Sequence, residues 1–309
     1  MDLEAKTPAA AQARRDLIDQ GSHLFPNPVD PAAAQALLAL IRADRAFDSS
    51  LFQTEADFRA NPQYTGVNPR PGRNLLERFQ PELAFLEQDP RIVAAVGDIL
   101  GDGYQILDRK VVCGVPDSAV PAWVKAIIAG NPVNNLGAFM RPEYRDITYF
   151  YGIDFHQDLI DFKDRDADFL TLYCYLHPVG RADAPLFLLD GSHLLGATVF
   201  PHDLAHSGPD SWTYGDRQGQ RIEVAQRVLT GGAGFAAIWH PCTLHGTQPD
   251  AADHERISLR YLLARRPGAP AGMDEINAAL KGPLRLSSTR VDLAGDGSAA
   301  IKANTVNQA

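Results

Sequence analysis

Seven short runs rich in β-branched and aromatic residues dominate the middle of the 309-residue chain. Turn residues separate these runs, and no helical pattern lies between them. Many short strands of this kind are typical of an antiparallel sandwich or barrel. The strands are expected over residues 104–112, 147–155, 169–176, 186–189, 221–228, 234–240 and 257–263.

Helices are expected before these strands. Asp30 precedes Pro31 and Asp89 precedes Pro90. An acidic N-cap followed by proline at the first helical position is a common helix start. Apolar residues recur at helical spacing after both prolines. The sequence therefore predicts a single domain with helical support over about 1–103, a β core over about 104–265 and a tail over 266–309.

Two long segments, residues 116–145 and 202–220, have an irregular pattern. Loops of this length in a compact domain are commonly lids, binding loops or disordered segments. The two segments contain Trp123, Trp212 and Tyr214. Aromatic side chains on such loops can line a substrate cleft, although they equally often pin the loop to the barrel. We expect these three residues to contact a substrate.

Net charge and cysteine usage restrict the partners and the compartment. The 29 basic and 38 acidic residues give a net charge of -9, whereas nucleic-acid binding needs a dense basic surface. No apolar stretch approaches the roughly 18 residues of a spanning helix, and the N-terminus lacks the apolar part of a signal peptide. The three cysteines lie far apart in the sequence, unlike those of a disulfide framework or a thiolate zinc site. We expect no nucleic acid, no membrane and a cytoplasmic location.

One triplet predicts a metal site. Among nine histidines only His156 begins an H-x-D triplet, which it forms with Asp158 at the end of an aromatic run. Residues i and i+2 of a strand face the same side, so the imidazole and the carboxylate can converge. His245 is the candidate third ligand. Two imidazoles and one carboxylate occupy one face of an octahedral Fe(II) and leave three positions open for a co-substrate and O2.

An arginine and a serine that follow the candidate ligands are two residues apart, which is the spacing of side chains on one face of a strand. Arg256 comes eleven residues after the last of these ligands, and Ser258 lies on the same face of the expected strand. A guanidinium binds a carboxylate bidentately and a hydroxyl adds one bond. These two side chains, with Thr247, are candidates to bind the distal carboxylate of a dicarboxylate. Arg260 shares the strand face and is the competing anchor, and Lys110 is a further candidate.

Other stretches accompany these residues in a fixed order. Residues 185–193 read PLFLLDGSH, His240-Pro241 precedes His245-Gly246-Thr247, and Arg256 follows. This order resembles the phytanoyl-CoA dioxygenase family of Fe(II)/2-oxoglutarate oxygenases. That family usually has Gly-Pro-Leu-x-x-x-Pro-Gly-Ser-His between the ligands, whereas this chain has alanine for the first glycine and aspartate for the second proline, both at turns. The resemblance covers about residues 21–265, and most firmly 150–265.

The resemblance implies a mainly β fold with flanking helices, namely a double-stranded β-helix of jelly-roll, cupin-like form with N-terminal helices. It also implies that the chain is an enzyme using Fe(II), 2-oxoglutarate and O2, with His156, Asp158 and His245 as metal ligands. Succinate and CO2 are then the co-products. The expected reaction is oxidation, foremost hydroxylation, of an unactivated C–H bond in a small metabolite or natural-product intermediate. Desaturation, epoxidation and rearrangement stay open.

Two alternatives differ in class from this interpretation. The first is a cupin-type metalloenzyme that does not use 2-oxoglutarate, and the spacing of Arg256 argues against it. The second is a non-catalytic barrel that binds a small molecule, and the intact ligand set argues against it. The presence of Asp158 also argues against a halogenase, which leaves the carboxylate position open for chloride. A small-molecule substrate is the expected partner of a monomer or homodimer.

Overall fold

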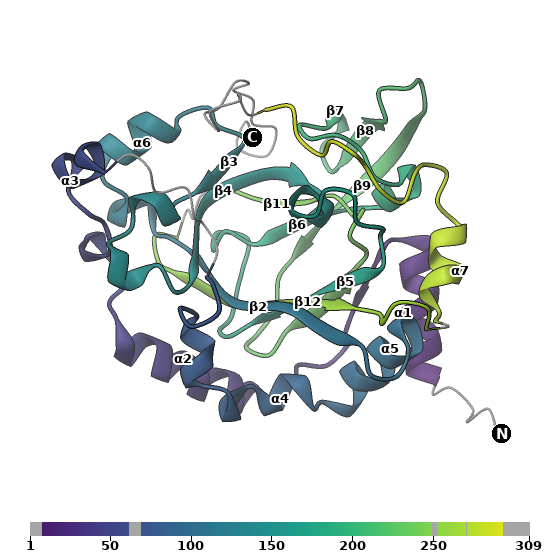
Figure 1. Ribbon diagram of the computed structural model, residues 1–309, viewed down its shortest axis with the longest axis horizontal. Helices are drawn as coiled ribbons and strands as arrows, with labels where there is room; N and C mark the ends of the chain where they lie inside the picture. Colours follow the sequence, from purple (N-terminus) through teal and green to yellow (C-terminus); the bar gives the residue numbers. More distant parts are fainter. Residues whose placement is uncertain (1–7, 62–68, 249–251, 270, 293–309) are drawn as a thin grey trace.

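The computed structural model describes residues 8–61, 69–248, 252–269 and 271–292 (Figure 1). Twelve described strands join into one sheet, which bends into two facing layers. The order across the sheet is β1 (Ser22–Leu24), β10 (Ala236–Trp239), β5 (Phe169–Tyr175), β12 (Arg256–Ala264), β2 (Gln105–Gly114), β4 (Thr148–His156), β11 (His245–Thr247), β6 (Leu186–Asp190), β9 (Arg221–Leu229), β8 (Ser211–Gly215) and β7 (Asp203–Gly208), while β3 (Val133–Asn135) pairs with β4.

The parallel pairing of β2 with β4 connects the two layers of the sheet. It aligns Val112 with Thr148 and Gly114 with Phe150, and the other named pairings are antiparallel. One layer contains β2, β12 and β5, and the facing layer contains β4, β11 and β6 (Figure 1). Two facing layers of antiparallel strands form the double-stranded β-helix, so the predicted fold is confirmed. All seven expected strands are present, with ends shifted by a few residues.

Helices pack around this core on more than one side (Figure 1). They are α1 (Pro8–Asp19), α2 (Pro31–Asp44), α3 (Glu55–Ala60), α4 (Ala84–Glu87), α5 (Pro90–Leu100), α6 (Ala122–Ile128) and α7 (Met273–Ala278). The two predicted starts are confirmed, because Asp30 accepts a hydrogen bond from Ala33 N and Asp89 accepts one from Arg91 N. Helices α2, α4 and α5 lie on the side of the layer formed by β2 and β12 (Figure 1). None of the described helices has the length and apolar character needed to cross a membrane.

Alternation along β12 separates the helix-facing core from the interior. Its outward side chains belong to the cluster shared with the helices: Ile257, Leu259, Tyr261 and Leu263. The intervening residues include Arg256, Ser258 and Arg260, which a two-residue period turns to the opposite face. The strand therefore presents polar side chains to the space between the layers, because the helices cover only its other face.

The two segments expected to be irregular contain regular structure, and that prediction is wrong. Residues 202–220 form the β7–β8 hairpin, in which Trp212 and Tyr214 alternate with polar residues. Residues 116–145 contain α6, β3 and several 3-10 turns. Of the expected tail, residues 293–309 lie outside the described residues.

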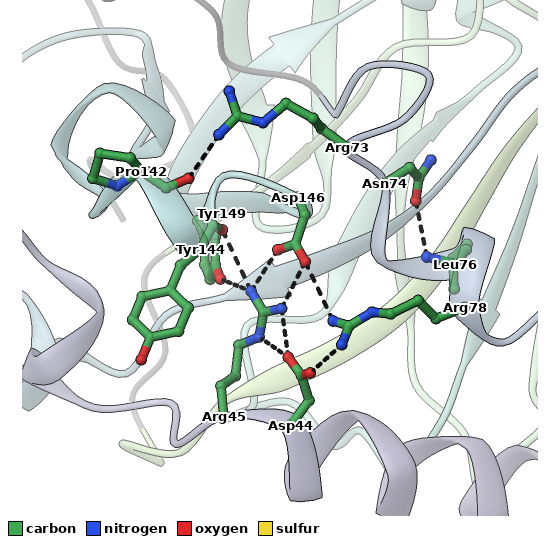
Figure 2. A network of polar contacts seen from close by, with 10 residues as sticks. All are labelled: Asp44, Arg45, Arg73, Asn74, Leu76, Arg78, Pro142, Tyr144, Asp146 and Tyr149. Carbon is green, nitrogen blue, oxygen red and sulfur yellow. Dashed lines mark hydrogen bonds and ion pairs between the residues drawn. The ribbon is translucent and has the colours of Figure 1, made fainter.

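A buried arginine ties the end of α2 to the start of β4 (Figure 2). The Arg45 guanidinium donates to Asp44 at 2.6 Å and to both carboxylate oxygens of Asp146 at 2.6 and 2.8 Å. It also donates to the Tyr149 hydroxyl at 3.0 Å, and Arg78 lies 2.7 Å from Asp44. Because β4 carries His156 at its other end, this network positions the strand that delivers a candidate metal ligand.

Breaking this network is expected to destabilise the fold. An Arg45→Met variant leaves two partly buried carboxylates with fewer partners, which costs about 3 kcal/mol or more of unfolding free energy. Arg59→Met is the matched control, because Arg59 is exposed and, among the described residues, forms its ion pair with Glu55 of the same helix, a contact worth about 0.5 kcal/mol. Urea unfolding measures both values. Equal, small losses in the two variants contradict the assigned role.

Candidate metal centre and adjoining pocket

The three predicted ligands converge in the structure. His156 is the last residue of β4, Asp158 begins a 3-10 turn over Asp158–Asp161, and His245 begins β11. Pairing of β11 with β4 places His245 opposite His156, and their ring centroids are 4.2 Å apart. One ligand atom from each of the three residues lies within 4.8 Å of the others. The arrangement is compact enough for one ion to contact all three.

The position of Asp158 has a different cause from the one expected. The same-face argument assumed a continuing strand, but β4 stops at His156 and the chain turns. The buried Gln157 fixes that turn, because its amide donates to Gly196 O and Cys242 O at 2.8 Å each and accepts from Thr198 N at 2.9 Å. The sequence analysis missed Gln157. Its place between two candidate ligands was the available signal.

Three side chains orient the Asp158 carboxylate, which is 1% exposed. Trp239 Nε1 donates to Oδ2 at 3.0 Å, the Thr171 hydroxyl donates to the same oxygen, and Arg260 pairs with Oδ1. Burial disfavours the charge, but the Arg260 charge and the hydrogen bond from Thr171 more than offset it and hold the pKa of Asp158 below its usual range. The carboxylate is therefore ionised and able to ligate a cation.

Backbone carbonyls set the tautomer of both imidazoles. His156 Nδ1 lies 3.0 Å from Asp154 O, and His245 Nδ1 lies 3.1 Å from Thr243 O. A carbonyl only accepts, so Nδ1 of each ring carries the proton and Nε2 keeps its lone pair. Burial lowers the pKa of both histidines, which favours their neutral forms. Neutral imidazoles with a backbone-bonded Nδ1 are the usual state of metal-binding histidines.

A cavity of about 410 Å³ opens beside this cluster. Its described lining includes two of the candidate ligands together with the predicted Arg256 and Thr247 and the competing Arg260 and Lys110. The remaining lining residues are Val112, Val133, Asn135, Phe150, Ile153, Ile160, Asp161, Tyr173, Leu186, Trp239 and Arg290. A space of this size and mixed character is typical of a small-molecule site.

Arg256 is equipped to bind an anion in this cavity. It is 1% exposed, its Nη1 donates to the Tyr173 hydroxyl at 3.0 Å, and its Nε is buried with no hydrogen-bond acceptor among the described residues. Among the described residues Arg256 has no carboxylate partner, and the Ser258 hydroxyl is buried without a described partner, but Ser258 does not line the cavity as described. A buried, uncompensated guanidinium is costly unless a ligand supplies the negative charge. The Arg256 guanidinium, whose Nε has no acceptor among the described residues, therefore fits a carboxylate.

The remaining predicted site residues have other contacts. Thr247 lines the cavity, but its hydroxyl already donates toward the carbonyls of Ala184 and Pro185, at 3.0 and 3.1 Å. Arg260 is engaged with Asp158, so it lies beside the ligand cluster. Lys110 lies inside β2 rather than at its end, lines the cavity and is 2% exposed. Trp239 lines the cavity and donates a hydrogen bond to Asp158, and the sequence analysis did not single it out.

The three aromatic residues expected at the substrate lie elsewhere. Trp123 packs against Phe58 and Phe139, with ring centroids 5.3 and 5.7 Å apart. Trp212 and Tyr214 are buried in a cluster between β6, β8 and β9, and neither lines the cavity as described. These side chains pin their segments to the core. The first long segment still reaches the cavity, through Val133 and Asn135 of β3.

Comparison with known proteins shows similarity in structure only. No protein-family model matches the chain, and no curated protein is significantly similar. The structure of EctD from S. alaskensis with bound Fe is 14% identical, with 94% of this chain and 90% of that chain covered and a TM-score of 0.50. The apo structure of the non-heme monooxygenase ThoJ is 14% identical, with 90% of this chain and 89% of that chain covered and a TM-score of 0.49. The structure of the epimerase SnoN in complex with Fe3+, alpha ketoglutarate and nogalamycin RO is 16% identical, with 93% of this chain and 96% of that chain covered and a TM-score of 0.49. The chain therefore shares its fold with EctD, a protein solved with iron bound.

Proposed function

We propose that this protein is an Fe(II)- and 2-oxoglutarate-dependent dioxygenase that oxidises a small molecule, foremost by hydroxylating an unactivated C–H bond. One observation carries the proposal. A cluster of two histidines and one aspartate adjoins the same cavity as a buried arginine whose Nε has no hydrogen-bond acceptor in the part of the chain that the structure describes. The donor set suits Fe(II), and the arginine suits the far end of a dicarboxylate bound to it.

Each residue has a defined task in this proposal. His156, Asp158 and His245 would hold Fe(II) on one face. Arg256 would bind the distal carboxylate of 2-oxoglutarate, with the Ser258 hydroxyl close by on the same strand face. Thr247 would line the pocket with its hydroxyl turned to the backbone.

The chemistry itself belongs to the cofactor. Iron, 2-oxoglutarate and O2 together supply an oxidant strong enough to break a C–H bond, with succinate and CO2 as co-products. The chain positions the reactants and keeps water away. Water is excluded by the apolar side chains that line the cavity, which are Phe150, Ile153, Leu186 and Trp239.

The alternatives predict different properties. A cupin-type metalloenzyme that does not use 2-oxoglutarate would not need a buried arginine without a carboxylate partner. A barrel that only binds a small molecule would not need two histidines whose Nε2 atoms are left free to bind a metal. The substrate we propose is a metabolite or biosynthetic intermediate, acted on by a monomer or homodimer. A cytoplasmic location also stays a prediction, and the burial of all three cysteines as thiols is consistent with it.

Succinate formation tests this function. The full chain is purified without metal, supplied with Fe(II), 2-oxoglutarate and O2, and assayed alone and with a panel of metabolites. We expect slow succinate release that a suitable metabolite accelerates and that His245→Ala abolishes. His206→Ala is the matched control, because His206 is exposed on β7. Metal binding without succinate would favour the cupin alternative, and the absence of both would favour a binding barrel.

A further inference from the structure

The pairing of β5 with β10 brings three side chains together on one face of the sheet. Alternate residues of β5 belong to the core shared with the helices, namely Leu170, Leu172 and Cys174. The two-residue period of a strand therefore turns Thr171 and Tyr173 to the opposite face. Trp239, the last residue of β10, lies directly opposite Thr171 in the register, and Tyr173 is its diagonal neighbour. Trp239 and Tyr173 both line the cavity.

This register explains why two donors from different strands reach one oxygen. Trp239 Nε1 donates to Asp158 Oδ2 at 3.0 Å, and the hydroxyl of Thr171 donates to the same oxygen. The Trp239 side chain is 1% exposed, so bulk water cannot replace its N–H. Without that N–H, Oδ2 keeps Thr171 as its one donor among the described residues. The indole N–H therefore fixes the rotation of a candidate metal ligand.

The ring of the same indole contacts two further functional side chains. Its centroid lies 5.0 Å from the ring of His245 and 5.7 Å from the ring of Tyr173. His245 has the ring of His156 on another side, with 4.2 Å between the centroids. The indole therefore restricts the rotation of a candidate metal ligand through its ring as well as through its N–H.

Tyr173 in turn holds the arginine assigned to 2-oxoglutarate. Its hydroxyl accepts a hydrogen bond from Arg256 Nη1 at 3.0 Å, and the guanidinium carbon lies 5.9 Å from the centroid of its ring. The ring of Tyr173 is held by Trp239 and by Tyr175, whose centroid is 5.8 Å away. Displacing Tyr173 therefore moves the anchor for the distal carboxylate.

We propose that Trp239 is a positioning residue for both halves of the site. Its N–H orients Asp158 toward the metal, and its ring holds Tyr173 and, through Tyr173, the Arg256 guanidinium. The inference rests on the proposed function, which assigns the metal and 2-oxoglutarate to these residues. Different atoms of the indole perform the two tasks, so substitutions can remove one task and keep the other.

A Trp239→Phe variant removes the N–H and keeps an aromatic ring. We expect the affinity for Mn(II), used as a stable probe of the iron site, to fall at least tenfold, because partners of metal ligands change metal affinity by about 10- to 100-fold. The affinity for 2-oxoglutarate at saturating Mn(II) is expected to change less than threefold. Electron paramagnetic resonance counts the free Mn(II), and calorimetry measures 2-oxoglutarate binding.

Trp212→Phe is the matched control. Trp212 is 3% exposed, its Nε1 donates to Gln226 Oε1 at 2.9 Å, and it does not line the cavity as described. Both substitutions therefore remove one buried indole hydrogen bond, and urea unfolding is expected to show similar losses of stability. A purely structural role of Trp239 would change both variants alike. We expect Trp212→Phe to keep both affinities within twofold.

A Trp239→Leu variant removes the ring as well. We expect its affinity for 2-oxoglutarate at saturating Mn(II) to be at least fivefold lower than that of Trp239→Phe, because Tyr173 loses its packing partner. A double-mutant cycle with Tyr173→Phe tests the route of this effect. In the Tyr173→Phe background, which lacks the hydroxyl bound to Arg256, exchanging Phe for Leu at position 239 is expected to change the affinity less than twofold.

Two results overturn the inference while the proposed function stands. The first is a Trp239→Phe variant whose Mn(II) affinity stays within twofold of the unaltered chain or falls no more than that of Trp212→Phe. The second is an equal effect of the ring on 2-oxoglutarate with and without the Tyr173 hydroxyl. If Trp239→Leu does not fold, the Trp239→Phe comparison decides alone. Failure of the unaltered chain to bind Mn(II) or 2-oxoglutarate overturns the proposed function together with this inference.

Discussion

An Asp158→Ala variant is expected to lose metal-dependent turnover, with its affinity for Fe(II) lowered by more than about a hundredfold. Residues that merely support a metal ligand change affinity by about 10- to 100-fold, and Asp158 is a candidate ligand itself. Its carboxylate lies in the cluster with both imidazoles, and its Oδ1 is 3.6 Å from His245 Nε2. Metal titration followed by calorimetry measures the loss.

The control must separate loss of metal from loss of fold. Removing the carboxylate alone leaves Arg260 buried without its partner, which costs about 3–5 kcal/mol of unfolding free energy. The double variant Asp158→Ala/Arg260→Met removes both charges and is expected to recover most of that stability without recovering metal binding. Tight Fe(II) binding by a folded double variant contradicts the assignment of Asp158 as a ligand.

An Arg256→Gln variant is expected to raise the requirement for 2-oxoglutarate more than tenfold. A charged contact left unmade costs about 2–5 kcal/mol, and about 1.4 kcal/mol corresponds to tenfold in affinity. The unpaired Nε of Arg256 points to this role, because no described carboxylate satisfies it. Titration of 2-oxoglutarate at saturating metal gives the apparent affinity.

Two neighbouring substitutions sharpen this comparison. Ser258→Ala removes a single hydroxyl and is expected to cost about 1 kcal/mol, or a few-fold in affinity. Arg260→Gln is expected to affect 2-oxoglutarate less than Arg256→Gln does, since Arg260 is bound to Asp158. A larger loss of 2-oxoglutarate affinity in Arg260→Gln than in Arg256→Gln assigns the anchor to Arg260 instead.

The fold was predictable where the sequence alternates. On β12 the outward residues pack against helices and the inward residues are polar, so one short segment specified both the core and the cavity. The β7–β8 hairpin was missed because β7 contains Asp and Gly, which have low β propensity, and β8 is only five residues long. The alternation of Trp212 and Tyr214 was the signal present, and it indicates core packing.

The metal cluster was predictable and the surroundings of the cavity were not. The H-x-D triplet and a later histidine were enough to predict three metal ligands, because a metal site accepts few residue types and few spacings. Contacts such as that of Trp239 with Asp158 join residues that are 81 positions apart in sequence, and they form only in the folded chain. The opposition of Lys110 and Arg260 is likewise a property of the β2–β12 pairing, which no local pattern specifies.

A crystal structure of the chain with Fe(II) and 2-oxoglutarate, grown without O2, tests the central claim most directly. Anomalous scattering at the iron edge locates the ion independently of any assumption about its ligands. We predict one iron peak bonded to His156, Asp158 and His245, with 2-oxoglutarate extending from it to the Arg256 guanidinium. Iron at another position, or a distal carboxylate bound to Arg260 instead of Arg256, contradicts the account.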